Sequence, residues 1–434
     1  MTKPVARDNP YAVLRNRDFL FFAIGRFIAS FGQQMLTVAV GWELYQRTHS
    51  SMALGVVGLT QFLPMLVMTI PAGHVADTRN RKNVILCMQL VLTLASAGLA
   101  LISHYAMPVN WIYGCLLVSA IARTFLWSAS ASFLPQLVSR EEFPRAINWA
   151  TSTFQFSAVT GPAIAGFLID LANPAGTPKP SAALIYIITA VTTGGCFALV
   201  CFVKPHHKPP EKQPMTLKSL LGGFHFVFNS RVILAIISLD LFAVLFGGAT
   251  TLLPVYAEDI LHCGAKGYGL LNAALPIGSL VCALYMAHRP PMEKAGRSLC
   301  LSVIIFGLAT VIFGLSTSFW LSLAMMFICG FADNVSVIVR HTLVQLLTPD
   351  AMRGRVSSVN NLFIGTSNEL GGFESGAVSA WRGPVFSVVS GGIATVLVVF
   401  GVAWIWPEIP KFGKLVQPAE PKPAVDPEQA TEKA

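Results

Sequence analysis

The chain has 434 residues, of which 54% are hydrophobic and only 12% charged, and its formal net charge at pH 7 is +9. Soluble domains carry about 25% charged residues, so this composition excludes an ordinary soluble protein. The apolar residues come in long blocks, such as 85–103 and 391–406. As helices, these blocks approach the roughly 20 residues that cross a bilayer. The sequence therefore predicts an all-α protein that crosses the membrane many times.

Hydropathy predicts twelve membrane-spanning helices, of which the eleventh is the least apolar. The first six are expected at Phe19–Tyr45, Met52–Ala72, Asn83–Ser103, Asn110–Leu134, Ala146–Leu171 and Ser181–Val203. The next six are expected at Val232–Ala257, Gly267–Ala287, Arg297–Ser316, Phe319–Leu346, Val356–Ala380 and Val385–Trp406.

The longest polar interval lies in the middle of the chain and contains an amphipathic piece around Leu217 to Phe228. It separates six spans from six. We therefore expect five parts: a cytoplasmic N-terminal segment (1–18), a six-helix bundle (19–203), a cytoplasmic linker (204–230), a second six-helix bundle (231–406) and a disordered cytoplasmic tail (407–434).

The two halves share features at matching places, which indicates an internal repeat. Gln136 and Gln345 each close the fourth span of their half in similar sequences, and Pro64 and Pro276 each lie in the second. Transporter folds are commonly built from such repeats. The expected fold is two pseudo-symmetric bundles of six helices.

The basic residues are distributed unevenly between the two sides. If the N-terminus is cytoplasmic, the expected outer loops hold only Arg47, Lys179, Lys266 and Arg382. This is the positive-inside pattern, which places both termini in the cytoplasm and points to a bacterial inner membrane. The net charge is thereby explained by topology, and no nucleic-acid partner is needed.

No motif for a bound group or a covalent reaction is present. The eight cysteines form no CxxC or Cys/His ligand spacing, so we expect no metal site or disulfide scaffold. A phosphate-binding loop and a nucleophile elbow are also missing from the sequence. We therefore expect no cofactor, no ATP-driven pumping and no enzymatic activity.

The stretch GHVADTRNRK, from Gly73 to Lys82, joins the second and third spans. It resembles the signature of the major facilitator superfamily, in which Gly is followed after three residues by Asp-Arg and, after one further residue, by Gly-Arg and then Arg or Lys. Gly73, Asp77, Arg81 and Lys82 match. Thr78 and Asn80 replace an Arg and a Gly, and Asn is a mild replacement because it tolerates positive φ. The resemblance implies a gate that holds the two halves together on the cytoplasmic side.

Two further stretches resemble the same superfamily. Gly161, Pro162 and Gly166 in the fifth span match a Gly-Pro element of its antiporters, with Ala165 in place of one Gly. Small residues and a proline would also suit any closely packed membrane helix. Residues 340–376 resemble a bacterial branch that contains the enterobactin exporter and macrolide-efflux-like proteins.

Ionisable residues inside spans are costly, by about 2.5–3.5 kcal/mol each on insertion scales, and are therefore candidates for function. Candidates for proton coupling are Asp240, Glu369, Glu374, Arg123 and Asp333, and candidates for the substrate cavity are Arg26, Gln33 and Gln34. Asp240 leads, because the resemblance implies that the first and seventh helices line the cavity. The alternative for each acid is a structural ion pair or a place at the water interface.

These features favour a secondary active transporter that exports a small amphipathic molecule, siderophore or drug-like, in exchange for protons. A proton-coupled importer of a small nutrient is the alternative, and a non-transporting sensor or scaffold on the same fold is a second. The expected partners are the substrate, protons and the lipid bilayer. The resemblance implies a monomer.

Overall fold

The computed structural model describes residues 11–173, 181–205, 217–290, 292, 294–349 and 352–413, most of which are helical. The long helices of the first half are α1 (Arg17–Thr48), α2 (Ser51–Thr78), α3 (Arg81–His104), α4 (Asn110–Phe133), α5 (Phe143–Ala172) and α6 (Ala183–Phe202). Those of the second half are α8 (Arg231–Phe246), α10 (Gly264–Ala287), α11 (Ala295–Leu315), α12 (Phe319–Leu347), α13 (Arg353–Arg382) and α14 (Pro384–Ile405). The predicted all-α fold is confirmed.

Eleven segments of the described chain are long and apolar enough to cross a bilayer. The eleventh expected span, Val356–Ala380, corresponds to α13, which is a continuous helix of 30 residues but is not among these eleven. α13 packs between α2 and α8, where protein rather than lipid surrounds much of its polar surface. Its crossing of the membrane stays a prediction.

The seventh span departs from the expected single helix over Val232–Ala257. α8 ends at Phe246 and is followed by η3 (Ala249–Leu252), α9 (Leu253–Val255) and the π-helix η4 (Tyr256–Ile260). The break begins at Gly247 and Gly248. A Cβ at Gly248 would lie 2.7 Å from the carbonyl oxygen of Gly371, so only glycine lets the chain pass so close to α13.

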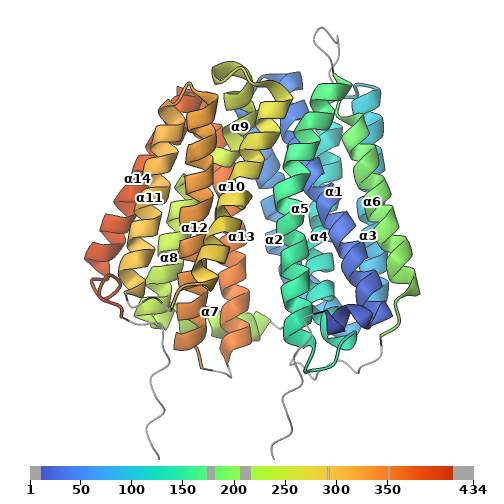
Figure 1. The fold of residues 1–434 in the computed structure, drawn as a ribbon, viewed down its shortest axis with the longest axis horizontal. Helices are drawn as coiled ribbons and strands as arrows, with labels where there is room; N and C mark the ends of the chain where they lie inside the picture. The colour runs from blue at the N-terminus through green and yellow to red at the C-terminus, as the bar shows by residue number, and fades with distance from the viewer. Residues whose placement is uncertain are drawn as a thin grey trace, which may run out of the picture.

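The helices form two groups, one of α1–α6 and one of α8–α14 (Figure 1). The groups meet mainly along two pairs, α2 with α13 and α5 with α10. Each pair joins the second long helix of one half to the fifth of the other, so the internal repeat relates the two pairs to each other.

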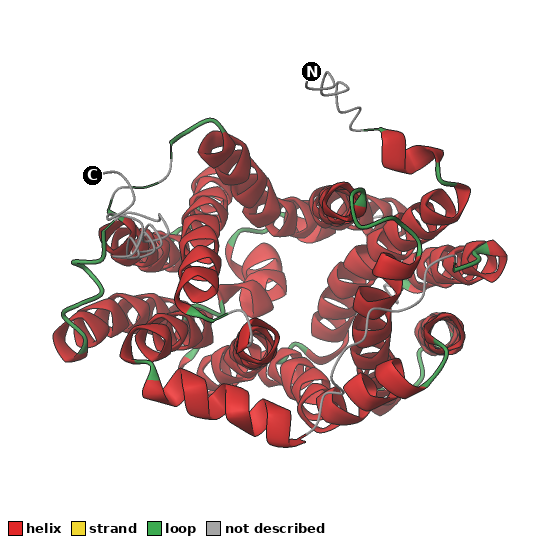
Figure 2. Cartoon of the chain, turned by 90° about the horizontal axis from the view of Figure 1, so that it is seen from below, coloured by secondary structure: helices red, strands yellow, loops and turns green. Residues whose placement is uncertain are grey.

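The described chain begins and ends on the same side of the molecule, which we call the terminal face; the opposite side is the distal face (Figures 1 and 2). α7 (Leu217–Asn229), at the place of the predicted amphipathic piece, also lies on the terminal face and packs on α13 and α8. We expected a solvent-exposed tail from residue 407 onward. Residues 407–413 instead pack on α11, with Ile409 buried and the Ala295 amide donating to the Gly413 carbonyl at 3.2 Å; the rest of the tail lies outside the described residues.

The seam between α5 and α10 depends on small residues. A Cβ at Gly269 would lie 2.6 Å from the carbonyl oxygen of Pro162 and 2.8 Å from the Cα of Gly166. The two backbones are therefore in direct contact, an arrangement that small residues allow in membrane helices. This contact lies in the distal half of both helices.

We expect Gly269→Ala to destabilise the protein by about 1–3 kcal/mol, because the added methyl group overpacks the seam. The measurement is the thermal unfolding midpoint of the purified protein in detergent. Gly114→Ala is the matched control, since a Cβ at Gly114 would meet no atom within 4 Å. A midpoint for Gly269→Ala equal to that of Gly114→Ala would contradict the packing argument.

Candidate functional site

The Gly73–Lys82 stretch forms the last turn of α2, a short link and the start of α3 on the terminal face. Arg81 is buried, and its Nε donates to the carbonyl of Ala76 at 3.0 Å, near the end of α2. Lys82 Nζ donates to the carbonyl of Cys201 at 2.8 Å, at the end of α6. These two contacts stay within the first half of the chain. Asp77 is partly buried in the last turn of α2.

The two residues that depart from the family pattern have local roles. Asn80 has φ −61°, so the positive φ that its glycine-like place suggested is not adopted. Its side chain instead caps α3, accepting a hydrogen bond from the amide of Lys82 at 3.0 Å, which is a preferred role of asparagine. The Thr78 hydroxyl donates to the His74 carbonyl at 2.8 Å. Neither residue supplies the cation that the pattern has at position 78.

The Gly-Pro element of α5 lies between two other helices. Gly161 faces α1, where a Cβ would lie 2.7 Å from the Cβ of Gln34. Gly166 faces α10 in the seam described above. The element therefore packs α5 against its own bundle on one side and against the other half on the opposite side.

Contacts fix the rotation of α1 about its axis. Gly32 lies against Thr189 and Thr192 of α6, and Gln34 lies against Gly161 of α5. At 3.6 residues per turn, Arg26 and Gln33 then share a third face that points to neither helix. Both side chains are partly exposed on this face. Of the two candidate glutamines, Gln33 lies on the face of Arg26, whereas Gln34 lies at the contact with α5.

Arg123 of α4 lies beside the seam between α2 and α13. Its guanidinium donates to the side-chain oxygen of Gln61 in α2, and its charge interacts with that of Glu369 in α13. The three groups come from both halves of the chain. Gln61 was not among the predicted residues, although an amide side chain inside the very apolar second span was a signal that could have indicated it.

Asp240 forms an ion pair with Arg340, which joins α8 to α12 within the second half. Both side chains are buried, with 7% and 3% of their surface exposed. Nε of Arg340 has no hydrogen-bond partner in the described chain. The predicted candidate Asp240 is thus in a protein interior, paired with a residue that lies within the expected tenth span, Phe319–Leu346.

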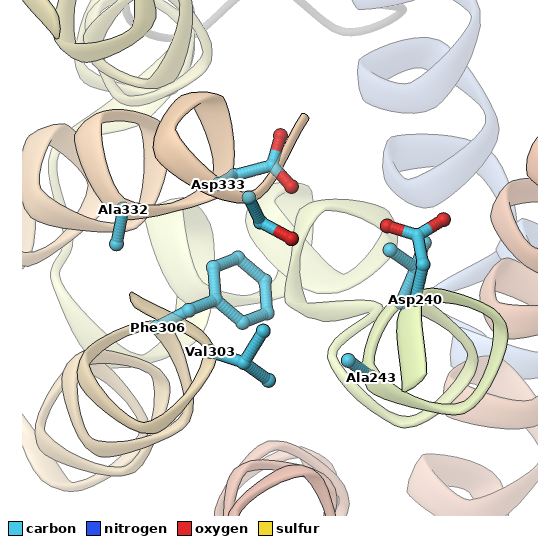
Figure 3. A pocket seen from close by; sticks show the side chains of 8 residues that line it. Asp240, Ala243, Val303, Phe306, Ala332 and Asp333 are labelled. Atoms are coloured by element: carbon cyan, nitrogen blue, oxygen red, sulfur yellow. The ribbon is translucent and has the colours of Figure 1, made fainter. Parts of the chain in front are cut away.

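Asp333 of α12 and Asp240 line the same small pocket (Figure 3). Phe306 and Val303 of α11 form its apolar wall, and the two carboxyl groups lie on opposite sides of it. The pocket volume is about 10 Å³, which is room for about one water molecule. It is too small to hold a substrate.

Glu374 lies apart from these groups. It is five residues after Glu369 on α13, which places it about 140° further around the helix. Its Oε2 accepts a hydrogen bond from Ser375 at 3.3 Å. The structure therefore brings Asp240, Asp333 and Arg340 together, and Arg123 with Glu369, but it does not bring Glu374 to either group.

The two halves also contact each other near the distal face. The Tyr45 hydroxyl of α1 donates to Asp259 of η4, and the ring of Trp42 stacks on that of Tyr268 in α10 at 5.7 Å between centroids. The Ser379 hydroxyl donates to that of Ser51 at 2.8 Å. The sequence did not predict these contacts, because they join segments far apart in the chain that share no motif.

No group of three or more His, Cys, Asp or Glu residues that could hold a metal ion occurs in the part of the chain that the structure describes. Among the acids discussed above, Asp240 pairs with Arg340, Asp259 accepts from the Tyr45 hydroxyl and Glu374 accepts from the Ser375 hydroxyl.

Comparison with known proteins identifies a family. The family model of the Major Facilitator Superfamily matches residues 22–372. Similar curated proteins include an enterobactin exporter EntS of Citrobacter koseri, 28% identical over 86% of this chain and 88% of the relative. Another is the enterobactin exporter EntS of Shigella boydii, 27% identical over 87% of this chain and 89% of the relative.

Solved structures with the same fold are also transporters. A bacterial homologue of the human lysosomal transporter Spinster, in an inward-facing and occupied conformation, has a TM-score of 0.75 at 13% identity, covering 93% of this chain and 98% of its own. The nucleoside transporter NupG has a TM-score of 0.69 at 16% identity, covering 90% and 99%. At these identities the likeness shows the fold.

Removing one partner of a buried ion pair leaves an uncompensated charge and costs about 3–5 kcal/mol in soluble proteins. We therefore expect Asp240→Asn and Arg340→Gln each to lower the stability of the detergent-solubilised protein, and the double variant to recover part of the loss. A double-mutant cycle measures the coupling, which we expect to exceed about 1 kcal/mol. Glu141→Gln, at an exposed position, is the control, and additive effects of the two single variants would contradict the pairing.

Proposed function

Because the chain belongs to the Major Facilitator Superfamily, and is thus a membrane transporter and not an enzyme, we propose that it exports a small amphipathic molecule in exchange for protons. The substrate class is a siderophore or a drug-like compound. Transport proceeds by alternating access, in which the two bundles rock about the substrate.

The observation that carries this proposal is the similarity to enterobactin exporters along most of both chains. The similar region includes both bundles and both seams, rather than one motif. An exporter also agrees with the Gly161–Gly166 element on α5, which resembles that of antiporters and lies at the seam between the halves.

The arrangement of charges supports an orientation. Arg79, Arg81 and Arg140 lie on the terminal face, where α2 meets α3 and where α4 is followed by α5. The positive-inside tendency then makes the terminal face cytoplasmic, with both termini inside the cell and the protein in the inner membrane as a monomer. In this orientation Tyr45–Asp259 and the stacked Trp42 and Tyr268 join the halves on the outer side, as in an inward-facing state.

The buried acids supply the means of coupling. A carboxyl group changes its proton affinity when the charges around it change. Asp240 has Arg340 as its neighbour, and Glu369 has Arg123 from the other half of the chain. Rocking of the bundles changes the distance between Arg123 and Glu369, because they belong to different bundles. Asp240 and Asp333 share a pocket within one bundle, and we assign proton binding to this pair. Glu369 has a different role, because its interaction with Arg123 changes when the two bundles move at the seam between α2 and α13.

Everted membrane vesicles test the proposal directly. The chain is expressed in a host that lacks its own enterobactin exporter, and the vesicles are energised to acidify their lumen. We expect enterobactin to accumulate in the vesicles and a protonophore to abolish the accumulation. A panel of amphipathic dyes tests the drug-like class in the same preparation.

Vesicles with Asp240→Asn are the matched control for coupling, since we expect them to lose proton-driven accumulation. Intact accumulation in Asp240→Asn vesicles together with its loss in Glu369→Gln vesicles would reverse the assignment of the two acids. Uptake by right-side-out vesicles without efflux would indicate an importer. Absence of transport in both preparations would favour a sensor or scaffold.

We expect Asp77→Asn to lower the transport rate about tenfold while substrate affinity changes little. A charge-assisted hydrogen bond contributes about 1.5–3 kcal/mol, and its loss at the gate shifts the equilibrium between the two transport states rather than the contacts with the substrate. Initial rates and equilibrium binding, measured on the same preparation, separate the two effects. Asp170→Asn is the control, because Asp170 is exposed near the distal end of α5, far from the Gly73–Lys82 stretch. A large loss of affinity with an intact rate would exclude the gate role.

A further inference from the structure

Arg26, a cation inside the first bundle, has no hydrogen-bond or ion-pair partner among the residues that the structure describes. Arg26 lies nine residues into α1, and the thiol of Cys196 on α6 is its electrostatic neighbour. Within the described residues it has neither an ion pair nor a hydrogen bond, unlike Arg123 with Gln61 and Arg340 with Asp240. An arginine inside a span is costly, and in membrane proteins such residues commonly mark a substrate or ion pathway.

Arg26 begins a polar stripe along α1. Ser30, Gln33 and Thr37 follow it at intervals of four, three and four residues, which places all four side chains on one helix face. This is the face that the contacts of Gly32 and Gln34 turn away from α6 and α5. All four side chains are at least partly exposed. The stripe therefore offers one guanidinium and three neutral hydrogen-bonding groups.

The second half carries acids at the matching places. Pro64 and Pro276 are 212 residues apart, Gln136 and Gln345 are 209 apart, and α1 and α8 begin 214 apart. Spacings of 214 and 210 residues relate Arg26 to Asp240 and Arg123 to Asp333. The internal repeat thus has opposite charges at equivalent positions, cations in the first bundle and carboxylates in the second.

This charge inversion makes the two bundles electrostatically different. An anionic group is attracted to the first bundle and repelled by Asp333 in the second, where Asp240 is already paired with Arg340. A guanidinium presents a planar fork of N–H donors that matches a carboxylate or another paired-oxygen anion.

We propose that Arg26 binds an anionic or acidic oxygen group of the substrate, and that the other residues of the polar stripe on α1 bind the remaining polar groups of the substrate. The inference rests on the proposed transport function and specifies its substrate class: amphipathic molecules with a paired-oxygen acid, rather than the lipophilic cations that many drug exporters would accept. Arg26 and the matched Asp240 therefore have different roles, one in substrate binding and the other in proton binding.

Equilibrium binding to the purified full chain in detergent tests this assignment. The probes are naphthalene-2-carboxylate and its neutral isostere naphthalene-2-carboxamide. We expect the wild type to bind the carboxylate more tightly. Arg26→Gln should weaken carboxylate binding about tenfold or more, the usual consequence of losing a charge-assisted contact, and should leave carboxamide binding within about twofold. Arg140→Gln, at an exposed loop position, is the control and should change neither.

If Arg26→Gln does not fold, Arg26→Lys provides a second test of the same binding site. It keeps the charge but loses the fork, so we expect the preference for the carboxylate to fall by about threefold. An unchanged preference in either variant, equal binding of the two probes by the wild type, or no saturable binding of the carboxylate would overturn the assignment. Because no proton gradient is present, a failure of enterobactin transport alongside Arg26-dependent binding would reject the proposed function and leave the anion site standing.

Discussion

Lipid cannot solvate a charge, and this constraint explains how the interior of the molecule is arranged. Asp240 pairs with Arg340 between α8 and α12, and Arg123 donates to Gln61 and is attracted electrostatically to Glu369 where α2 meets α13. Each group ties helices together that hydrophobic packing alone would leave free to slide, since lipid and leucine are equally apolar. The helices around these groups cannot rotate without exposing a charge. The positions of the charges therefore fix the faces of the helices.

Close backbone contact complements this arrangement at the two seams. Gly166 and Gly269 bring α5 and α10 together, and Gly55 and Gly376 do the same for α2 and α13. Glycine contacts hold helices by van der Waals packing without interlocking side chains. The seams can thus be broad and still allow the bundles to pivot. The Asp240–Arg340 pair ties helices together within the second bundle, while the glycine seams lie where the two bundles can pivot.

The sequence was sufficient for the all-α class and for most spans, because long apolar blocks have few alternatives in a bilayer. It also placed Asp240 and Arg340 inside the membrane, but not as a pair, since pairing depends on the rotation of α8 and α12. The break after Phe246 escaped hydropathy, because Gly247 and Gly248 do not interrupt an apolar run. Asn80 shows another limit: its place in a motif suggested positive φ, whereas its local chemistry made it a helix cap. Contacts such as Tyr45–Asp259 form only where the two halves meet, so the sequence of either segment alone does not predict them.

The interruption after α8 has a mechanical consequence. α8 itself is packed on α13 and α14, but the short helices beyond Gly248 carry Asp259 and lead into α10. The chain therefore has a joint between a part anchored in its own bundle and a part that touches the opposite one. Movement at the distal side can be absorbed over a few residues, at the expense of the Tyr45–Asp259 and Ser379–Ser51 hydrogen bonds and the Trp42–Tyr268 ring stack. The free energy needed to separate the halves at the distal side therefore depends on these few contacts. It can be altered without disturbing the Asp240–Arg340 ion pair inside the second bundle.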